Sequence, residues 1–77
     1  MDKELIEYMA KSLVDDPAQV RVSVVEEEQS TILELRVAPE DIGKVIGKHG
    51  RIAKAMRTVL QAAAAKNGKH SVLEILD

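Results

Sequence analysis

Two glycines three positions apart constrain this chain more than any other feature. Gly47 and Gly50 enclose Lys48 and His49, and the four residues separate two segments whose apolar residues recur at helical spacing. Glycine reaches backbone conformations that other residues avoid, so a chain bent this tightly can press against a phosphate chain. A helix that begins at Gly50 also offers free N–H groups to an anion. The four residues therefore predict a phosphate-contacting turn between two helices.

Length and composition limit the other possibilities. The 77 residues predict one domain, residues 1–77, that buries about two-thirds of its surface and is marginally stable alone. The absence of cysteine excludes disulfides and thiolate metal sites and fits a cytoplasmic location. No signal peptide is expected, because no basic stretch leads into an apolar run, and no apolar run is long enough to span a membrane.

Charge is distributed unevenly, although the net charge is only −2. Residues 1–42 hold four basic against eleven acidic residues, a balance of −7, whereas residues 43–77 hold seven against two, a balance of +5. No acidic residue occurs between Gly43 and His70. Such asymmetry is typical of a basic face on an acidic body, although chance clustering on solvated helix faces gives the same pattern.

Hydrophobic periodicity predicts six elements in the order helix, strand, strand, helix, helix, strand. Helices are expected at about 2–14, 39–46 and 50–66, and strands at about 20–24, 31–37 and 71–76. The stripe of the last helix that is expected to face the sheet is Ile52, Met56, Val59, Leu60 and Ala63. The two-helix crossover makes the second and third strands parallel neighbours, whereas the first two form an antiparallel hairpin. The expected fold is therefore α+β, a mixed three-stranded sheet with helices packed on one face.

This order of elements, with the pattern Val45-Ile46-Gly47-x-x-Gly50 between consecutive helices, resembles the type II KH domain. At closer range, the stretch from Gly43 to Thr58 resembles the KhpA family, small bacterial proteins that consist of a single KH domain. The resemblance covers essentially the whole chain, because the family is about this long.

The resemblance implies a cleft that holds about four nucleotides of single-stranded RNA. Its first wall is the GxxG loop and the helices beside it, here Ile42, Gly43, Lys44, Val45, Ile46, Gly47, Lys48, His49, Gly50, Arg51 and Lys54. Its second wall is the last strand and the loop before it, here Lys69, His70, Ser71 and Val72. The residues themselves suit these roles, because the N–H groups at 48–51 can meet phosphates and Lys48 and Arg51 add positive charge.

Several of these residues keep a second interpretation. Lys54 and Arg57 either contact the RNA or only solubilise an exposed helix face, and for Arg57 we expect the second. His49 and His70 are either phosphate contacts or solvated loop residues. Gly43 costs about 1 kcal/mol against alanine inside a short helix, so it serves either close approach of RNA or close packing.

An enzyme is not expected. The run from Gly43 to His49 resembles a P-loop superficially, but it is one residue short, and His49 replaces the hydroxyl that binds Mg²⁺. His49 and His70 have no carboxylate or thiolate at ligand spacing, so neither a metal nor another cofactor is predicted.

The KhpA resemblance also implies protein partners, either a second copy of the chain or a KH protein of the Jag/KhpB type, and a role as an RNA chaperone or post-transcriptional regulator. Small residues spaced three or four apart on the long helix predict a homodimer contact at Ala55, Thr58, Ala62 and Ala65. A helix-favouring solvent face explains the same residues. The alternative function is a protein-interaction module with little RNA binding, but such KH domains usually carry a degraded or acidic loop.

Overall fold

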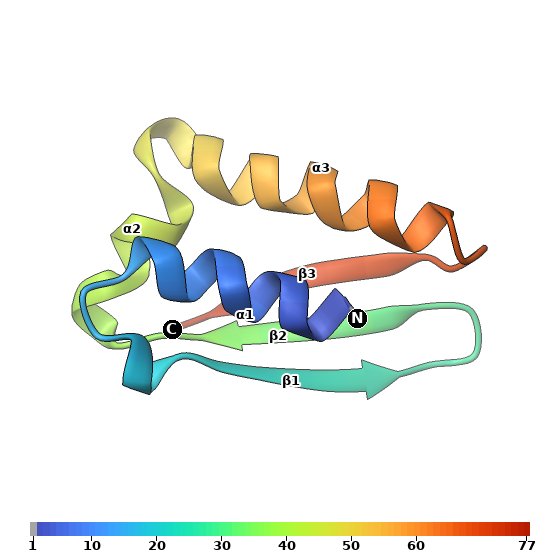
Figure 1. Cartoon of the computed structure of the whole chain (residues 1–77), viewed down its shortest axis with the longest axis horizontal. Helices are drawn as coiled ribbons and strands as arrows, with labels where there is room; N and C mark the ends of the chain where they lie inside the picture. The colour runs from blue at the N-terminus through green and yellow to red at the C-terminus, as the bar shows by residue number, and fades with distance from the viewer. Residues whose placement is uncertain (1) are drawn as a thin grey trace.

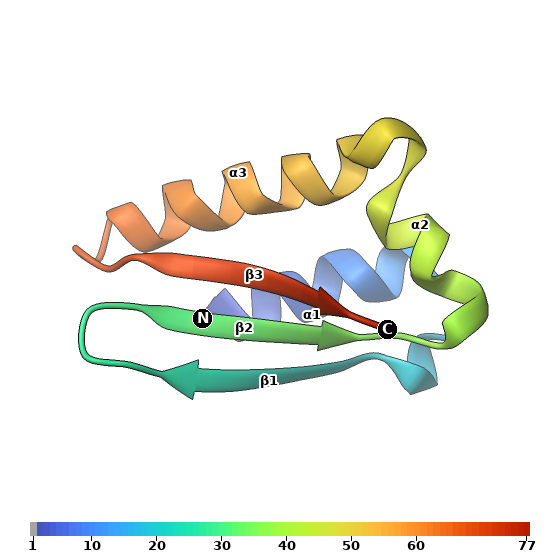
Figure 2. The same cartoon turned by 180° about the vertical axis from the view of Figure 1, so that it is seen from behind.

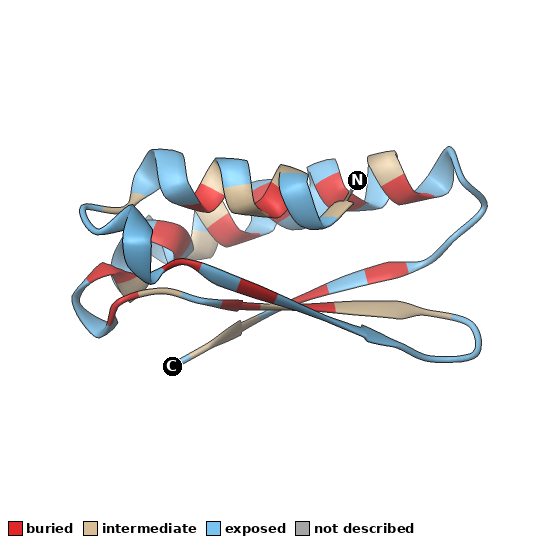
Figure 3. Cartoon of the chain, turned by 60° about the horizontal axis from the view of Figure 1, so that its bottom comes forward, coloured by how far each residue is buried: buried red, intermediate tan, exposed pale blue. Residues whose placement is uncertain are grey.

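The structure is a computed structural model that describes residues 2–77; Met1, the first residue of the expected domain, lies outside the described part. Three strands, β1 (Arg21–Glu26), β2 (Thr31–Arg36) and β3 (Ser71–Leu76), form one sheet in the order β1-β2-β3. β1 and β2 are antiparallel, and β2 and β3 are parallel. Helices α1 (Asp2–Leu13) and α3 (Arg51–Ala65) lie across one face of the sheet (Figures 1 and 3). The predicted α+β fold and its order of elements are therefore confirmed.

Short 3-10 turns connect these elements. The turn η1 (Pro17–Gln19) follows α1, and η2 (Pro39–Asp41) precedes α2 (Ile42–Ile46). Proline fits both turns because its missing N–H is not needed at the first helical position. The helix expected at 39–46 is thus a 3-10 turn followed by a short α-helix. The turn η3 (Lys48–Gly50) then leads into α3.

The hydrophobic core lies between the helices and the sheet. Inward and outward residues alternate along β2, as the two-residue period of a strand requires. The buried cluster consists of Ile6, Ala10, Val20, Val22, Leu33, Leu35, Val45, Met56, Leu60 and Leu73. Val24, two residues after the buried Val22 and so on the same face of β1, is 43% exposed, and it lines an open hollow beside the start of α1.

The buried stripe of α3 differs from the predicted stripe. Ala53, Met56, Leu60 and Ala64 are the buried residues of α3, spaced three and four residues apart. Val59, predicted to be buried, is 44% exposed. Periodicity locates an apolar stripe, but it does not say which flank of that stripe the sheet covers.

The two ends of the molecule's long axis carry different elements (Figures 1 and 2). The turn at 47–50, α2 and the C-terminal end of β3 lie at one end. The loop at 66–70 and the β1–β2 hairpin lie at the other, with the 15 residues of α3, about 22 Å of helix, between them. Among residues 2–77, no helix is long and apolar enough to cross a membrane.

Candidate nucleic-acid interface

The GxxG loop takes its shape from three residues with positive φ. Gly47 has φ 78° and ψ 172°, His49 has φ 58° and ψ 24°, and Gly50 has φ 74° and ψ 15°. L-residues rarely adopt positive φ, and histidine is among the few that do so more often than most. Gly47 ends α2 with a positive φ and an extended ψ, a combination that is essentially confined to glycine.

The three glycines near this loop have different structural roles. A Cβ at Gly47 would lie 2.6 Å from Cγ1 of Ile52, so the fold needs glycine there for space as well as for backbone angle. A Cβ at Gly50 or Gly43 would meet nothing within 4 Å. Close packing against the rest of the domain therefore does not explain Gly43.

The loop leaves two backbone amides open. Gly50 N–H donates to Gly47 O at 3.1 Å, and Arg51 N–H donates to Lys48 O. No backbone acceptor within residues 2–77 is found for the amides of Lys48 and His49. Of the N–H groups at 48–51 that were expected to meet phosphates, these two are the open ones, whereas the other two stabilise the turn.

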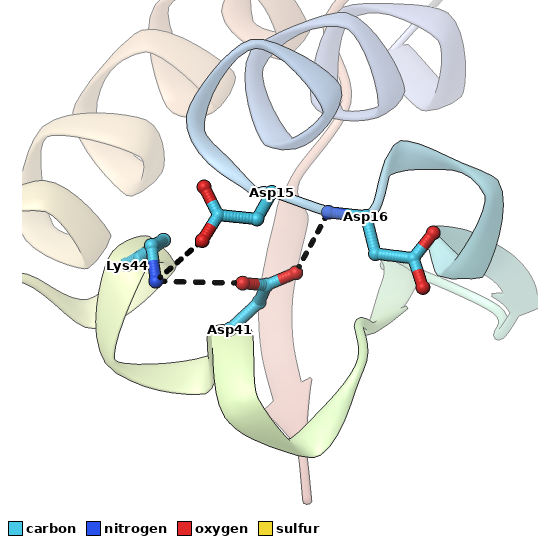
Figure 4. Close-up of polar contacts among 4 residues, drawn as sticks. All are labelled: Asp15, Asp16, Asp41 and Lys44. Carbon is cyan, nitrogen blue, oxygen red and sulfur yellow. Dashed lines mark hydrogen bonds and ion pairs between the residues drawn. The ribbon is translucent and has the colours of Figure 1, made fainter.

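A buried carboxylate holds α2 against the end of α1 (Figure 4). Asp41 is 2% exposed; its Oδ2 accepts a hydrogen bond from Asp16 N–H at 3.1 Å, and its Oδ1 lies 3.5 Å from Lys44 Nζ. Lys44 Nζ also lies 3.3 Å from Asp15 Oδ2. Burial alone would raise the pKa of Asp41, but the amides of Asp16 and Asp15 and the Lys44 charge lower it overall. The pKa of Lys44 is raised, chiefly by its bond to Asp15.

Two residues expected at the RNA surface therefore have structural roles. The charge of Lys44 is already balanced by two carboxylates. Val45 is completely buried, because it is the residue of α2 that points into the core, and its side chain does not line any surface. Ile46, its neighbour, is 38% exposed and Ile42 is half-buried, so these two remain as the apolar surface beside the loop.

The cations around the loop are free of carboxylate partners. Lys48, Arg51 and Lys54 are all exposed, and no ion pair joins any of them to an acidic group in the part of the chain that the structure describes. Lys48 belongs to the loop that carries the open amides, Arg51 follows that loop directly, and Lys54 lies in the first turn of α3. This end of the molecule is therefore suited to bind an anion.

Lys69 and His70 do not reach this site. They lie at the opposite end of α3, beside the acidic β1–β2 turn, where His70 O accepts a hydrogen bond from Thr31 N–H at 2.9 Å. With the glutamates at 26–28 they line a hollow of about 390 Å³. Ser71 is buried and donates to Asp2 Oδ2 at 3.3 Å. The structure thus places Lys69 and His70 of the expected second wall at the far end of α3 from the GxxG loop, because a strand that returns along a helix starts at the helix's far end.

Arg57 was expected to be a solvated side chain, but it bridges α3 and β3. Its Nε donates to the carbonyl oxygen of Leu73 at 3.4 Å. The sequence shows that Arg57 follows Met56, a residue of the predicted apolar stripe. Nothing in the sequence identifies a backbone carbonyl on another element as the partner of Arg57.

The predicted dimer residues all lie at the surface. Ala55, Thr58, Ala62 and Ala65 are exposed on α3, and the Thr58 hydroxyl donates to Lys54 O at 3.0 Å within its own helix.

No group of three or more His, Cys, Asp or Glu residues within 2–77 is arranged to hold a metal ion. His49 and His70 lie at opposite ends of α3 and share no site.

Known proteins resemble this chain over nearly its whole length. The family model described as "KhpA/KhpB, KH domain" matches residues 3–75. RNA-binding protein KhpA of Clostridium acetobutylicum is 66% identical over 74 residues, which cover 96% of this chain and 99% of that protein. RNA-binding protein KhpA of Treponema pallidum is 54% identical over 77 residues, which cover 100% of this chain and 96% of that protein.

Solved structures show the same fold inside larger proteins. Aquifex aeolicus Era bound to GDP and aluminium fluoride aligns with a TM-score of 0.66 and 19% identity over 96% of this chain and 29% of that chain. Era in complex with MgGDPNP and a segment of 16S ribosomal RNA aligns with a TM-score of 0.65 over 96% of this chain and 28% of that chain. This chain spans less than a third of either Era chain, and the likeness concerns the fold alone. On the family match and the close relatives together, the chain belongs to the KhpA/KhpB family of KH domains.

Proposed function

We propose that this protein, a single KH domain, binds single-stranded RNA through its GxxG loop and catalyses no reaction. The observation that carries the proposal is the loop itself, which has two open amides and is accompanied in the chain by the exposed cations Lys48, Arg51 and Lys54. Relatives covering nearly the whole chain are named RNA-binding proteins. A KH domain clamps about four nucleotides with such a loop.

The second wall of the proposed cleft is the C-terminal half of β3 rather than Lys69 and His70. This half of the strand lies at the same end of the molecule as the loop. In the part of the chain that the structure describes, β3 pairs with β2 alone, so its other edge has no neighbouring strand. Ile42 and Ile46 supply apolar surface on the helical side of the cleft.

We further propose that the protein works as a homodimer, or paired with a KH protein of the Jag/KhpB type, as a cytoplasmic RNA chaperone or post-transcriptional regulator. Val59 and Tyr8, 44% and 73% exposed, add apolar area beside the small residues of α3. Both line an apolar hollow of about 490 Å³ between α1 and α3. A dimer would place two loops on one particle and raise the avidity for long RNA.

The same hollow favours a second candidate function, a protein-interaction module with little RNA binding. A gel shift with pooled cellular RNA separates the two candidates. RNA binding predicts a shifted band that excess single-stranded RNA abolishes. A protein that leaves the pool unshifted at tens of micromolar, yet still pairs with a KH partner, would favour the interaction module.

A further inference from the structure

The outer edge of β3 presents backbone groups that pair with no neighbouring strand among residues 2–77. The Leu73 carbonyl accepts from Arg57 on α3, so it points away from β2. His70 O is bonded to Thr31 at the start of β2 and so points toward β2. Successive residues of a strand direct their backbone groups to alternate sides. The N–H and C=O groups of Ser71, Leu73 and Ile75 therefore face the open edge.

Arg57 is the side chain that reaches this edge from the helix. It lies on α3 next to the buried Met56, seven residues after Gly50, or about 10 Å along the helix axis from the loop. Lys54 and Gln61, one turn before and after it, are exposed on the same flank. A strand of nucleic acid that runs from the loop along the proposed cleft would pass this guanidinium.

The contact of Arg57 leaves most of its hydrogen-bonding capacity unused. Within residues 2–77 only Nε is bonded, at the long distance of 3.4 Å, and the guanidinium carries five N–H donors in a planar fork. No ion pair within residues 2–77 involves Arg57. The Leu73 carbonyl thus orients the guanidinium without neutralising it, and its outer N–H groups remain available.

We propose that Arg57 is a specificity-determining residue that selects bases with two adjacent hydrogen-bond acceptors, a role that rests on the proposed RNA binding. An arginine fork pairs with O6 and N7 of guanine, and O2 and N3 of cytosine present the same pattern on an unpaired base. Adenine N7 has an amino donor beside it, and in uracil an N–H separates the two carbonyl oxygens. The shared chemistry is therefore guanine or cytosine against adenine or uracil.

Fluorescence anisotropy with labelled RNA octamers tests this role. One octamer is all uridine, and three others carry a single guanosine, cytidine or adenosine at the same central position. We expect the parent protein to bind the guanosine or the cytidine octamer about tenfold more tightly than the other two, since one bidentate pair discriminates by that order. The octamer that binds more tightly, with guanosine or with cytidine, identifies the base that Arg57 selects.

Arg57→Ala and Arg57→Lys should both remove this preference and keep the parent affinity for the all-uridine octamer within about threefold. A lysine preserves the charge but not the fork. Arg36→Ala removes the same charge from an exposed position on β2 and should keep the preference. Equal weakening on all four octamers, or a preference that survives Arg57→Ala, would overturn the role. A parent that binds all four octamers equally overturns the role alone, whereas a parent that binds none contradicts the proposed RNA binding as well.

Discussion

The side chain of Ile52 fills the space that a side chain at Gly47 would need. A Cβ at position 47 would lie 2.6 Å from Cγ1 of Ile52 and 2.9 Å from its Cβ. The first turn of α3 therefore packs directly on the backbone that ends α2. This contact fixes the direction in which the loop leaves α2, and with it the position of the two open amides.

Replacement of the two loop glycines should consequently have unequal effects. Gly50→Ala meets no atom within 4 Å and should cost about 1–2 kcal/mol for the left-handed backbone alone. Gly47→Ala adds a steric clash with Ile52, and overpacking of this kind costs roughly a further 1–3 kcal/mol. Urea unfolding of both variants measures the difference. Equal losses of stability would show that Ile52 moves aside freely.

Gly43 should behave in the opposite way. It lies in α2 with open space around it, so Gly43→Ala should raise the free energy of unfolding by about 0.5–1 kcal/mol. If RNA approaches this backbone closely, the same variant should bind RNA more weakly although it is more stable. A more stable variant with unchanged RNA affinity would place the RNA away from Gly43.

The hydrogen bond and the ion pair of Asp41 should make the free energy of unfolding depend on pH in the acidic range. The folded-state pKa of Asp41 lies below its ordinary value of 3.8, so its stabilising contribution is present above pH 3.8 and is lost as pH falls through the lowered value. Asp41→Asn should therefore be less stable than the parent at pH 7, and the difference should shrink in acid.

Asp16→Asn is the matched control for this prediction, because Asp16 bonds to Asp41 through its backbone N–H and not through its carboxylate (Figure 4). Thermal unfolding between pH 7 and pH 2 compares the three proteins. A gap between parent and Asp41→Asn that stays constant over this range would mean that the Asp41 charge contributes nothing.

The proposed dimer predicts a specific effect of charge on α3. Ala62→Asp should yield a folded monomer, because Ala62 is exposed and only a partner would bury it. The variant should bind long RNA more weakly and short oligonucleotides as before, since avidity needs two loops. Light scattering measures the mass, and Ala18→Asp, an exposed alanine in η1, serves as control. A parent that is monomeric at tens of micromolar contradicts the dimer.

The sequence predicted the order of elements because each helix and strand has its own apolar period and its own stop signal. It did not predict which flank of α3 the sheet covers, since Val59 and Leu60 are equally apolar and only the position of α1 distinguishes them. The family resemblance assigned Lys69 and His70 to the same cleft as the loop, but it does not give their distance from the loop. The length of α3 alone separates them from the loop by about 22 Å.

The partners of Arg57 and Lys44 could not be predicted from the sequence either. Helical spacing shows that both side chains leave their helices outside the core. Their acceptors, the Leu73 carbonyl and the Asp15 carboxylate, come from segments 16 and 29 residues away in the chain. Only the packed fold brings such groups together.

Two double variants with the same change of charge test most directly whether the protein binds single-stranded RNA through its GxxG loop. Lys48→Asp with His49→Asp places two carboxylates at the open amides, and aspartate tolerates the positive φ of His49. Lys69→Asp with His70→Asp makes the same change at the opposite end of α3. Anisotropy with one single-stranded RNA should show binding lost in the first variant and retained in the second. Binding that survives at the loop, or is lost only at Lys69 and His70, would contradict the account.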